Sequence, residues 1–294
     1  MGVEEYIEES KYADALATLD ESQIVIFGVP FDGTSSHRAG SANAPDAIRR
    51  ESYNYETFLN RYGIDIETVK IHDMGNSKKF SSVIELMAEL PDYFKDIVKM
   101  GKFLITLGGE HSVTVPVVKT IHELNSDKSI GIVYLDAHLD FRESYLDERY
   151  SHACAAKRLS EIVGMENLVE IGIRSYSHEE AEIVDSKKLK IFSADDVDNL
   201  GMKKVINETM GYLNTRYIYL TIDIDVFDPA YAPGVGNPEY FGLTPWQVRE
   251  CIEYLGKNLI GADIVEVSPP FDNGNTAALA AQLIQILICQ VIKK

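Results

Sequence analysis

The sequence has few cysteines and no spacing that would use them together. Cys154, Cys251 and Cys289 are far apart, odd in number and never in a CxxC pattern. A disulfide-based scaffold and a cysteine-ligated zinc site are therefore both unexpected, and a reducing cytoplasm is the compartment that fits best. The first residues also lack a basic segment followed by an apolar one, so we expect no signal peptide.

Basic residues are scarce relative to acidic ones. The chain has 28 Lys and Arg against 46 Asp and Glu, which gives a formal net charge of −18. Nucleic acids and anionic membrane surfaces bind basic patches, so neither is expected as a partner. The excess of acid is compatible with a small cationic substrate, although acidic surfaces are common in soluble proteins.

Long apolar runs are also missing. The longest, residues 277–292, is interrupted by Gln282, Gln285 and Gln290, and it predicts a buried helix rather than a membrane span. With 294 residues, 45% of them hydrophobic, the chain can bury a large core. We expect a single domain over residues 1–294, preceded by an N-terminal arm over residues 1–21.

Strand and helix patterns alternate from residue 23 almost to the end. Apolar runs without polar alternation predict strands that are covered on both faces. The predicted strands are 23–29, 68–72, 103–107, 130–135, 168–173, 190–192, 217–225 and 260–267. Helical patterns lie between them, for example at 81–99 and 115–124. The alternation predicts an α/β fold with three layers, α/β/α, and an open, mostly parallel sheet of about eight strands.

Metal-capable side chains follow three of these strands. Asp136, His138 and Asp140 come after strand 130–135, while Asp223 and Asp225 end strand 217–225 and His111 follows strand 103–107. Ligands of open parallel sheets bind beyond the carboxyl ends of the strands. On an extended backbone, residues two apart point to the same side, so we expect each set to converge. A cation would compensate their charge, since an unpaired buried carboxylate is costly.

Each of these residues has an ordinary alternative when it is considered alone. The stretch 136–140 could be a surface turn with scattered acids, Asp223 could cap a turn, and His111 could be a hydrogen-bonded loop histidine. Together, at one edge of one sheet, they indicate a metal site. Histidine and aspartate without thiolate favour an ion such as Mn²⁺, without excluding Zn²⁺ or Fe²⁺. Six ligands, four of them anionic, suit two ions bridged by carboxylates, which can share a water molecule and lower its pKa.

Four ordered motifs resemble the ureohydrolase family of arginases and agmatinases, with agmatinases the nearer of the two. They are GGEHS at 108–112, DAHLD at 136–140, DIDVFDPAYAPG at 223–234 and EVSPPFD at 266–272. The segment GVPFDGTSSHRAGSANAPDAIR at 28–49 is also similar to the first strand and loop of that family. The resemblance covers residues 23–290. Many members have Asp where this chain has Glu110, which is not a ligand position.

The resemblance implies two manganese ions per subunit. It assigns the first ion to His111, Asp136, Asp140 and Asp223, and the second to Asp136, His138, Asp223 and Asp225, with Asp136 and Asp223 shared. It also implies a proton shuttle at His152, whose pKa suits that task, and a carboxylate at Glu266 that receives the substrate guanidinium. His152, Glu266 and Asp140 are thus the candidate catalytic residues. A wet helix terminus is the alternative for His152, and the nearby Asp263 is expected to be structural.

The implied reaction is hydrolysis of a guanidino compound to urea and an amine. The loop 141–151 does not resemble the arginase loop, and its acids Glu143, Asp147 and Glu148 would suit an amine, whereas 228–244 resembles agmatinases. We therefore expect agmatine to be converted to putrescine and urea in polyamine biosynthesis. The alternatives are aminopropylagmatine (giving spermidine), then arginine or guanidinobutyrate. A one-metal hydrolase such as a deacetylase and a non-catalytic metal-binding assembly protein are alternatives from other classes. The resemblance further implies a homotrimer or homohexamer.

Overall fold

The central sheet of the computed structural model, which describes residues 10–186 and 188–293, has eight strands. All neighbouring pairs run parallel. In spatial order the strands are β4 (Ile71–Asn76), β1 (Ile24–Gly28), β5 (Phe103–Leu107), β10 (Leu259–Val265), β9 (Tyr217–Asp223), β6 (Ile130–Leu135), β7 (Leu168–Ile173) and β8 (Lys190–Ser193). The predicted parallel sheet of about eight strands is confirmed.

The strands are apolar because both faces of the sheet are covered. Every residue of β1, β5 and β6 is buried. Along β1, Ile24 and Ile26 belong to one hydrophobic core, while Val25 and Phe27 belong to the core on the opposite face. Because its side chains alternate between the two faces of the sheet, the strand contributes to both cores. This explains the continuous apolar run in the sequence.

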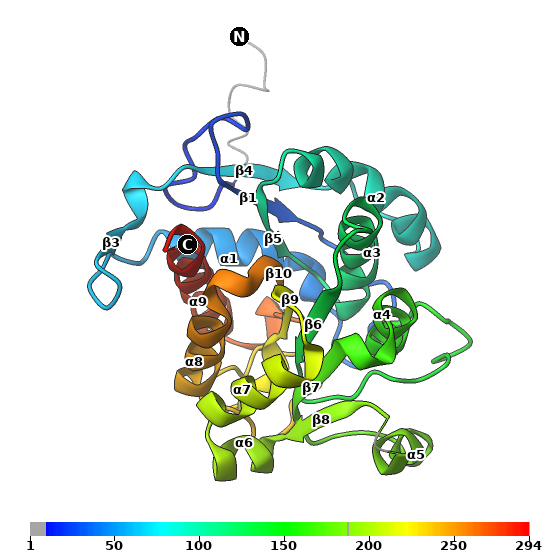
Figure 1. The fold of residues 1–294 in the computed structure, drawn as a ribbon. Coiled ribbons are helices and arrows are strands. Elements are labelled where there is room, and N and C mark those ends of the chain that lie inside the picture. The colour runs from blue at the N-terminus through cyan, green and yellow to red at the C-terminus, as the bar shows by residue number, and fades with distance from the viewer. Residues whose placement is uncertain (1–9, 187, 294) are drawn as a thin grey trace.

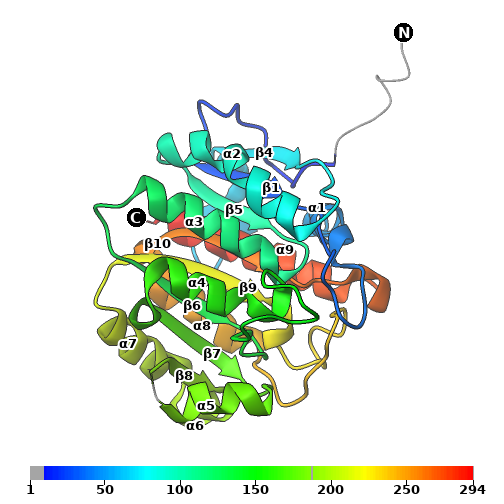
Figure 2. The same ribbon diagram turned by 90° about the vertical axis from the view of Figure 1, so that its right-hand side faces the viewer.

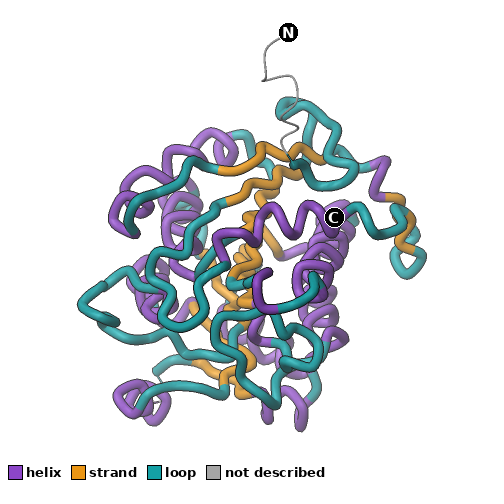
Figure 3. Tube along the Cα trace, turned by 180° about the vertical axis from the view of Figure 1, so that it is seen from behind, coloured by secondary structure: helices purple, strands orange, loops and turns teal. Residues whose placement is uncertain are grey.

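Two groups of helices form the outer layers (Figures 1 and 2). The helices on one face are α2 (Val83–Lys99), α3 (Thr114–Leu124), α4 (Ala155–Val163) and α5 (His178–Ser186). Those on the other face are α1 (Ala44–Ser52), α6 (Ala194–Leu200), α7 (Met202–Leu213), α8 (Pro245–Leu255) and α9 (Asn275–Ile292). Seen from behind, the strands lie in a row between these two groups (Figure 3). The three-layer α/β/α prediction is confirmed.

Helix α9 is the apolar segment that the sequence predicts to be buried. Its mean hydropathy of 1.6 over 18 residues is high enough for a membrane span by composition. However, 61% of that window is buried inside the protein, where the helix packs against α1 and α8. It is a core helix, as predicted.

Some local elements differ from the sequence-based expectation. The strand expected at 68–72 begins later, at Ile71, because residues 66–68 form a 3-10 turn whose start is capped by the Asp65 side chain. Helix α6 and the short hairpin of β2 (Phe58–Leu59) and β3 (Ile64–Asp65) were not predicted. Both are too short for hydrophobic periodicity to reveal them.

The described part of the N-terminal arm is attached to the outer edge of the sheet. Tyr12 is buried, its hydroxyl donates to the carbonyl of Ala281, and its backbone N–H donates to Asp73. Asp73 also receives two hydrogen bonds from the fully buried guanidinium of Arg49, at 2.8 and 2.9 Å. The expectation for residues 1–9 lies outside the described residues.

Candidate metal centre and active site

Four neighbouring strands at the centre of the sheet carry the candidate site residues at their carboxyl ends. His111 follows β5, Glu266 follows β10, Asp223 ends β9 and Asp136 follows β6. These strands are adjacent in space in the order β5, β10, β9 and β6, although they are distant along the chain. The crossovers between them therefore bring the four motifs to one edge of the sheet.

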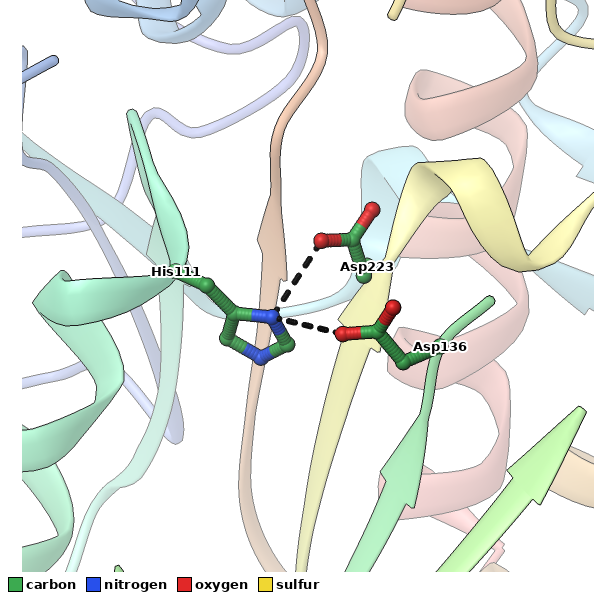
Figure 4. Close-up of side chains that lie close together, drawn as sticks. All are labelled: His111, Asp136 and Asp223. Carbon is green, nitrogen blue, oxygen red and sulfur yellow. Dashed lines mark ion pairs between the residues drawn. The ribbon is translucent and has the colours of Figure 1, made fainter. Parts of the chain in front are cut away.

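Five of the six candidate ligands form two overlapping clusters, His111 with Asp136 and Asp223, and Asp136 with His138 and Asp225. His111 Nδ1 lies 3.0 Å from Asp136 Oδ2 and 3.2 Å from Asp223 Oδ2 (Figure 4). His138 Nδ1 lies 2.9 Å from Asp225 Oδ2 and 3.5 Å from Asp136 Oδ1. In each cluster the ligand atoms lie within 4.8 Å of one another, which is close enough for one ion, and Asp136 contributes to both.

Asp140 lies at the edge of the first cluster. Its Oδ2 atom is 3.7 Å from His111 Nδ1 and accepts a hydrogen bond of 2.9 Å from the hydroxyl of Tyr134. The Tyr134 ring stacks on the imidazole of His111, with 4.3 Å between ring centroids. Asp140 is thus positioned beside the first cluster, but it is not one of the three residues whose ligand atoms lie within reach of a common point.

The local reason for this convergence is not the one that the sequence suggested. Strand β6 ends at Leu135, Asp140 has a positive φ of 49°, and Asp225 lies in a 3-10 turn at 224–226. Two of the aspartates hold these turns through their own side chains. Asp136 Oδ1 accepts from the N–H of His138 at 2.6 Å, and Asp223 Oδ1 accepts from the N–H of Asp225 at 2.8 Å. The side chains therefore converge through tight turns rather than through extended alternation.

Negative charge is in excess in this buried cluster. Among the described residues, no lysine or arginine side chain forms an ion pair with any of the four aspartates. Burial and the nearby Asp136 raise the pKa of Asp140 to about 8. Burial, Asp225 and Asp136 also raise the pKa of Asp223 well above its usual value. Carboxylates in such a place require a cation, since uncompensated buried charge is strongly unfavourable.

The donor atoms fit a pair of divalent ions. Asp136 Oδ2 is buried and accepts no hydrogen bond, so it has a free lone pair that faces the cluster. Burial alone would lower the pKa of His111, yet the carboxylates of Asp136 and Asp223 raise it well above its usual value. The same applies to His138, beside Asp225 and Asp136. Imidazole and carboxylate donors at this spacing suit Mn²⁺ and similar ions.

The ring of His111 is oriented from behind by a threonine and a carboxylate. Thr221 donates its hydroxyl to Asp263, so its oxygen can only accept from His111 Nε2, which lies 2.9 Å away. The proton on Nε2 is thereby held by Thr221, and Nδ1 is the nitrogen directed to the cluster, where the Tyr134 hydroxyl also lies 3.0 Å from it. Asp263, which was expected to be structural, accepts the hydroxyl proton of Thr221 and so supports His111 indirectly. It also accepts a hydrogen bond of 2.7 Å from the buried Tyr219 hydroxyl.

Glu266 lies at the same edge and lines the same cavity, with a volume of about 320 Å³. Its φ is 63°, a conformation that is uncommon for residues other than glycine. Its backbone N–H donates to the carbonyl of Gly109, and its carboxylate accepts from the N–H of His111, both at 2.8 Å. Burial and the nearby Glu110 raise the pKa of Glu266 well above its usual value.

His152 lines the cavity from the loop before α4. Burial, together with the histidines at positions 138 and 111, lowers its pKa to about 4, so its imidazole is neutral near pH 7. The cavity therefore brings together the following candidate residues: His138, Asp140, His152, Asp223, Asp225 and Glu266. His111 and Asp136 are buried directly beneath them.

The acids of loop 141–151 are not where the sequence analysis placed them. The Glu143 side chain is 70% exposed and lies 3.3 Å from Arg158, and Glu148 accepts from the N–H of Tyr150. Neither these two residues nor Asp147 lines the cavity. The expectation that they face the substrate is wrong, because the loop folds back on itself and on α4. Arg142 and Tyr145 line the cavity instead.

Other polar groups around the cavity were not found from the sequence. The carboxylate of Glu239 accepts from Ser175 Oγ at 2.9 Å and lies 3.7 Å from His138 Nε2. The buried Glu180 receives hydrogen bonds from the backbone of loop residues and lies 3.5 Å from Arg142. Arg174 donates to backbone carbonyls at 225, 226, 227, 239 and 240, and so fixes the loop behind Asp225. No spacing in the sequence marks these residues.

Comparison with known proteins gives a consistent result. A family model described as the arginase family matches residues 22–289. An agmatinase of Bacillus anthracis is 34% identical over 268 residues, which is 90% of each chain. An N(1)-aminopropylagmatine ureohydrolase of Thermococcus kodakarensis is 34% identical over 275 residues, covering 90% of this chain and 89% of that one. The crystal structure of an agmatine ureohydrolase of Thermoplasma volcanium is 40% identical, with a TM-score of 0.92 over 99% of this chain and 97% of that one.

Proposed function

This chain belongs to the arginase family, and on that premise we propose that it is a binuclear manganese ureohydrolase that cleaves agmatine to putrescine and urea. The observation that carries the proposal is the cluster of two histidines and three aspartates, with Asp140 beside it, at the floor of a cavity that is also lined by Glu266 and His152. All positions that the resemblance requires are present, which disfavours a non-catalytic assembly protein. Two overlapping ligand clusters disfavour a hydrolase with one metal.

Two ligand sets would hold the ions. His111, Asp136, Asp140 and Asp223 take the first, and Asp136, His138, Asp223 and Asp225 take the second. When bound, the ions supply a water molecule of lowered pKa and stabilise negative charge that develops on the reacting carbon's substituents. The chain contributes the arrangement of these side chains, since turns and hydrogen bonds fix them before any ligand arrives.

Glu266 is the group that receives the guanidinium. Its carboxylate lies at the cavity wall beside the ligand histidine, and a planar guanidinium presents paired N–H donors to a carboxylate. This contact would hold the guanidinium carbon over the floor of the cavity and desolvate it. Glu266 therefore supplies the negative charge that the guanidinium requires, since the carboxylates of the floor would be compensated by the ions that they hold.

His152 moves the proton in the second half of the reaction. Water adds its oxygen to the guanidinium carbon, the bond from that carbon to the substituted nitrogen breaks, and the nitrogen leaves as an amine that needs a proton. The products are urea and R–NH₃⁺. Both protons of the attacking water end on that nitrogen, and a neutral histidine at the cavity wall can accept one of them and pass it on.

The far end of agmatine is a second amine. The wall near that end holds the Arg142 guanidinium, but Glu180 lies 3.5 Å from it and balances its charge. Glu239 does not line the cavity, but its partly exposed carboxylate contacts His138 and Ser175, two residues that do. This distribution favours a positively charged tail over the carboxylate of arginine or guanidinobutyrate. The relatives named for agmatine support the same choice.

Aminopropylagmatine is the second candidate substrate, and the relative from Thermococcus kodakarensis favours it. Its extra aminopropyl group would extend past Glu239 toward solvent and give spermidine instead of putrescine. Either reaction belongs to polyamine biosynthesis in the cytoplasm, and the proposal includes a homotrimer or homohexamer of this chain.

The test is release of urea by the purified, manganese-loaded chain from four substrates at equal concentration: agmatine, aminopropylagmatine, arginine and guanidinobutyrate. We expect agmatine to give the highest kcat/KM, and Asp140→Asn to abolish urea release. Arginine as the best substrate would refute the agmatinase assignment. Full activity in Asp140→Asn would refute the catalytic role of the metal cluster.

A further inference from the structure

A chain of hydrogen bonds runs behind His152 and begins at Glu110. The Glu110 side chain is fully buried, and its Oε1 atom accepts from the hydroxyls of Thr34 and Ser112, each at 2.6 Å. Its Oε2 atom accepts from the N–H of Thr34 at 2.7 Å. The Thr34 oxygen in turn lies 3.0 Å from the backbone N of His152 and 3.2 Å from its Nδ1 atom.

The direction of these hydrogen bonds follows from the chemistry of the groups. Oε1 of Glu110 faces two hydroxyls and Oε2 faces a backbone N–H, and these three donors favour the ionised form, although burial raises the pKa of Glu110 to about 7. The ionised carboxylate can only accept, so the single hydroxyl proton of Thr34 is directed to Oε1. The Thr34 oxygen then has only lone pairs left for His152. One accepts from the backbone N–H, and the other faces Nδ1 of the ring. This leaves Nδ1 as the ring nitrogen that must donate.

We propose that Glu110 and Thr34 are positioning residues that hold the proton of the neutral His152 ring on Nδ1, so that Nε2 presents its lone pair to the cavity. The inference rests on the proposed function, in which His152 transfers a proton to the leaving amine. Among the described residues, no side chain or backbone group forms a hydrogen bond with Nε2. That nitrogen is therefore the one available to exchange protons with the substrate.

Among the residues that the structure describes, Ser151 is the one other group that contacts Nδ1, with its hydroxyl oxygen 3.3 Å away. If this hydroxyl donated to Nδ1, the lone pairs of Nδ1 and of the Thr34 oxygen would face each other at 3.2 Å, which is unfavourable. With the proton on Nδ1, both hydroxyl oxygens accept. The arrangement repeats the one behind His111, where the pair of Thr221 and Asp263 places the proton on Nε2.

Three substitutions, one of Glu110 and two of Thr34, separate this role from packing. In Glu110→Gln the amide oxygen still accepts from the Thr34 N–H. The amide NH₂ group takes the place of Oε1 and points to the hydroxyls of Thr34 and Ser112, which in the wild type donate to Glu110. Thr34 must then direct its own proton to Nδ1, so the tautomer reverses while the shape is kept. Thr34→Val removes the hydroxyl, and Thr34→Ser retains it.

The direct measurement is neutron diffraction from crystals of the manganese-loaded full chain grown in D₂O. We expect deuterium on Nδ1 of His152 in the wild type and on Nε2 in Glu110→Gln. Deuterium on Nε2 in the wild type would overturn the inference and leave the proposed function intact.

The kinetic measurement is a double-mutant cycle. We expect Thr34→Val and Glu110→Gln each to lower kcat by roughly ten-fold or more, with KM, metal content and Tm little changed, and Thr34→Ser to restore most of kcat. In a His152→Asn background, Thr34→Val should have almost no further effect. Thr209→Val, which changes another buried threonine far from the cavity, should match the wild type. An undiminished effect of Thr34→Val without His152 would overturn the inference.

The role of His152 and the positioning role of Thr34 and Glu110 can be refuted separately. If His152→Asn leaves kcat unchanged, the proposed role of His152 is wrong, whatever tautomer the crystals show. If His152→Asn lowers kcat but Thr34→Val does not, the positioning role alone is wrong. Should Glu110→Gln fail to fold, the comparison of Thr34→Val with Thr34→Ser decides the same question.

Discussion

The carboxylate of Glu266 accepts a hydrogen bond of 2.8 Å from the backbone N–H of His111. The group proposed to bind the guanidinium is thereby attached to the turn that carries a candidate metal ligand. Motifs separated by 155 positions share one rigid unit at the centre of the sheet. Because the carboxylate is held by the backbone and buried on most sides, its second oxygen has little freedom and is ready to meet a ligand.

Replacing Glu266 by glutamine should weaken substrate capture. The amide keeps the shape but loses the charge that pairs with a guanidinium, a contact worth about 1.5–3 kcal/mol, so kcat/KM should fall by about 10- to 150-fold. Initial rates of urea release over a range of agmatine concentrations measure this. Glu123→Gln, on the exposed surface of α3, serves as the control. Retention of wild-type kcat/KM by Glu266→Gln would argue against its role.

Manganese should stabilise the fold as well as support activity. Binding to a site that exists only in the folded chain contributes about 2.7 kcal/mol at a free ion concentration of 100 times Kd, which corresponds to a rise in Tm of roughly 5 °C or more. Calorimetry with and without Mn²⁺ after chelation measures the shift, and elemental analysis should find about two ions per chain. Asp136→Asn, which alters the ligand common to both clusters, should remove most of the rise. The exposed Asp92→Asn should retain it.

Glu239 should influence which substrates are preferred. A carboxylate that is 39% exposed, beside two residues that line the cavity, attracts a cationic tail with modest strength, so Glu239→Gln should lower kcat/KM for agmatine by about two- to five-fold. The rate with guanidinobutyrate, whose tail is negative, should stay equal or rise. The ratio of the two values of kcat/KM is the quantity to measure. An equal loss for both substrates would indicate damage to His138 instead of a specificity role.

The buried ion pair beneath the N-terminal arm should matter for stability and not for chemistry. Both side chains of the pair Arg49–Asp73 are fully buried, and Asp73 also caps the arm at Tyr12. Asp73→Asn leaves the buried guanidinium with only the exposed Asp46, 3.6 Å away, as a charged partner, and should reduce the free energy of unfolding by about 3–5 kcal/mol. Urea denaturation measures this loss, while kcat of the folded fraction should be unchanged. Glu85→Gln, at an exposed ion pair, should have little effect.

The sequence carried enough information for the architecture and for a set of candidate ligand residues. Uninterrupted apolar runs, such as 103–107 and 130–135, require cover on both faces, and alternation with helices then leaves a parallel sheet as the main solution. Short elements such as α6 were missed because their stability comes from tertiary packing.

The groups that surround the candidate ligands could not be predicted from the sequence. The sequence predicted that the acids of loop 141–151 suit the substrate. The direction of a loop side chain is set only when the loop folds, and the Glu143 carboxylate lies beside Arg158 instead. Likewise nothing local links Thr34 to Glu110, or Glu239 to Ser175.

The sequence by itself singled out the candidate ligands, because acids and a histidine that follow a buried strand, as Asp136, His138 and Asp140 do, favour a bound cation. Only the tertiary structure decided how those residues work. Parallel crossovers placed β5, β10, β9 and β6 side by side, so that four distant motifs meet at one edge. Contacts across that edge orient the rings of His111 and His152 through a threonine and a carboxylate. Hydrogen-bond direction depends on distances of a few tenths of an ångström between remote segments, and the order of residues does not encode such distances locally.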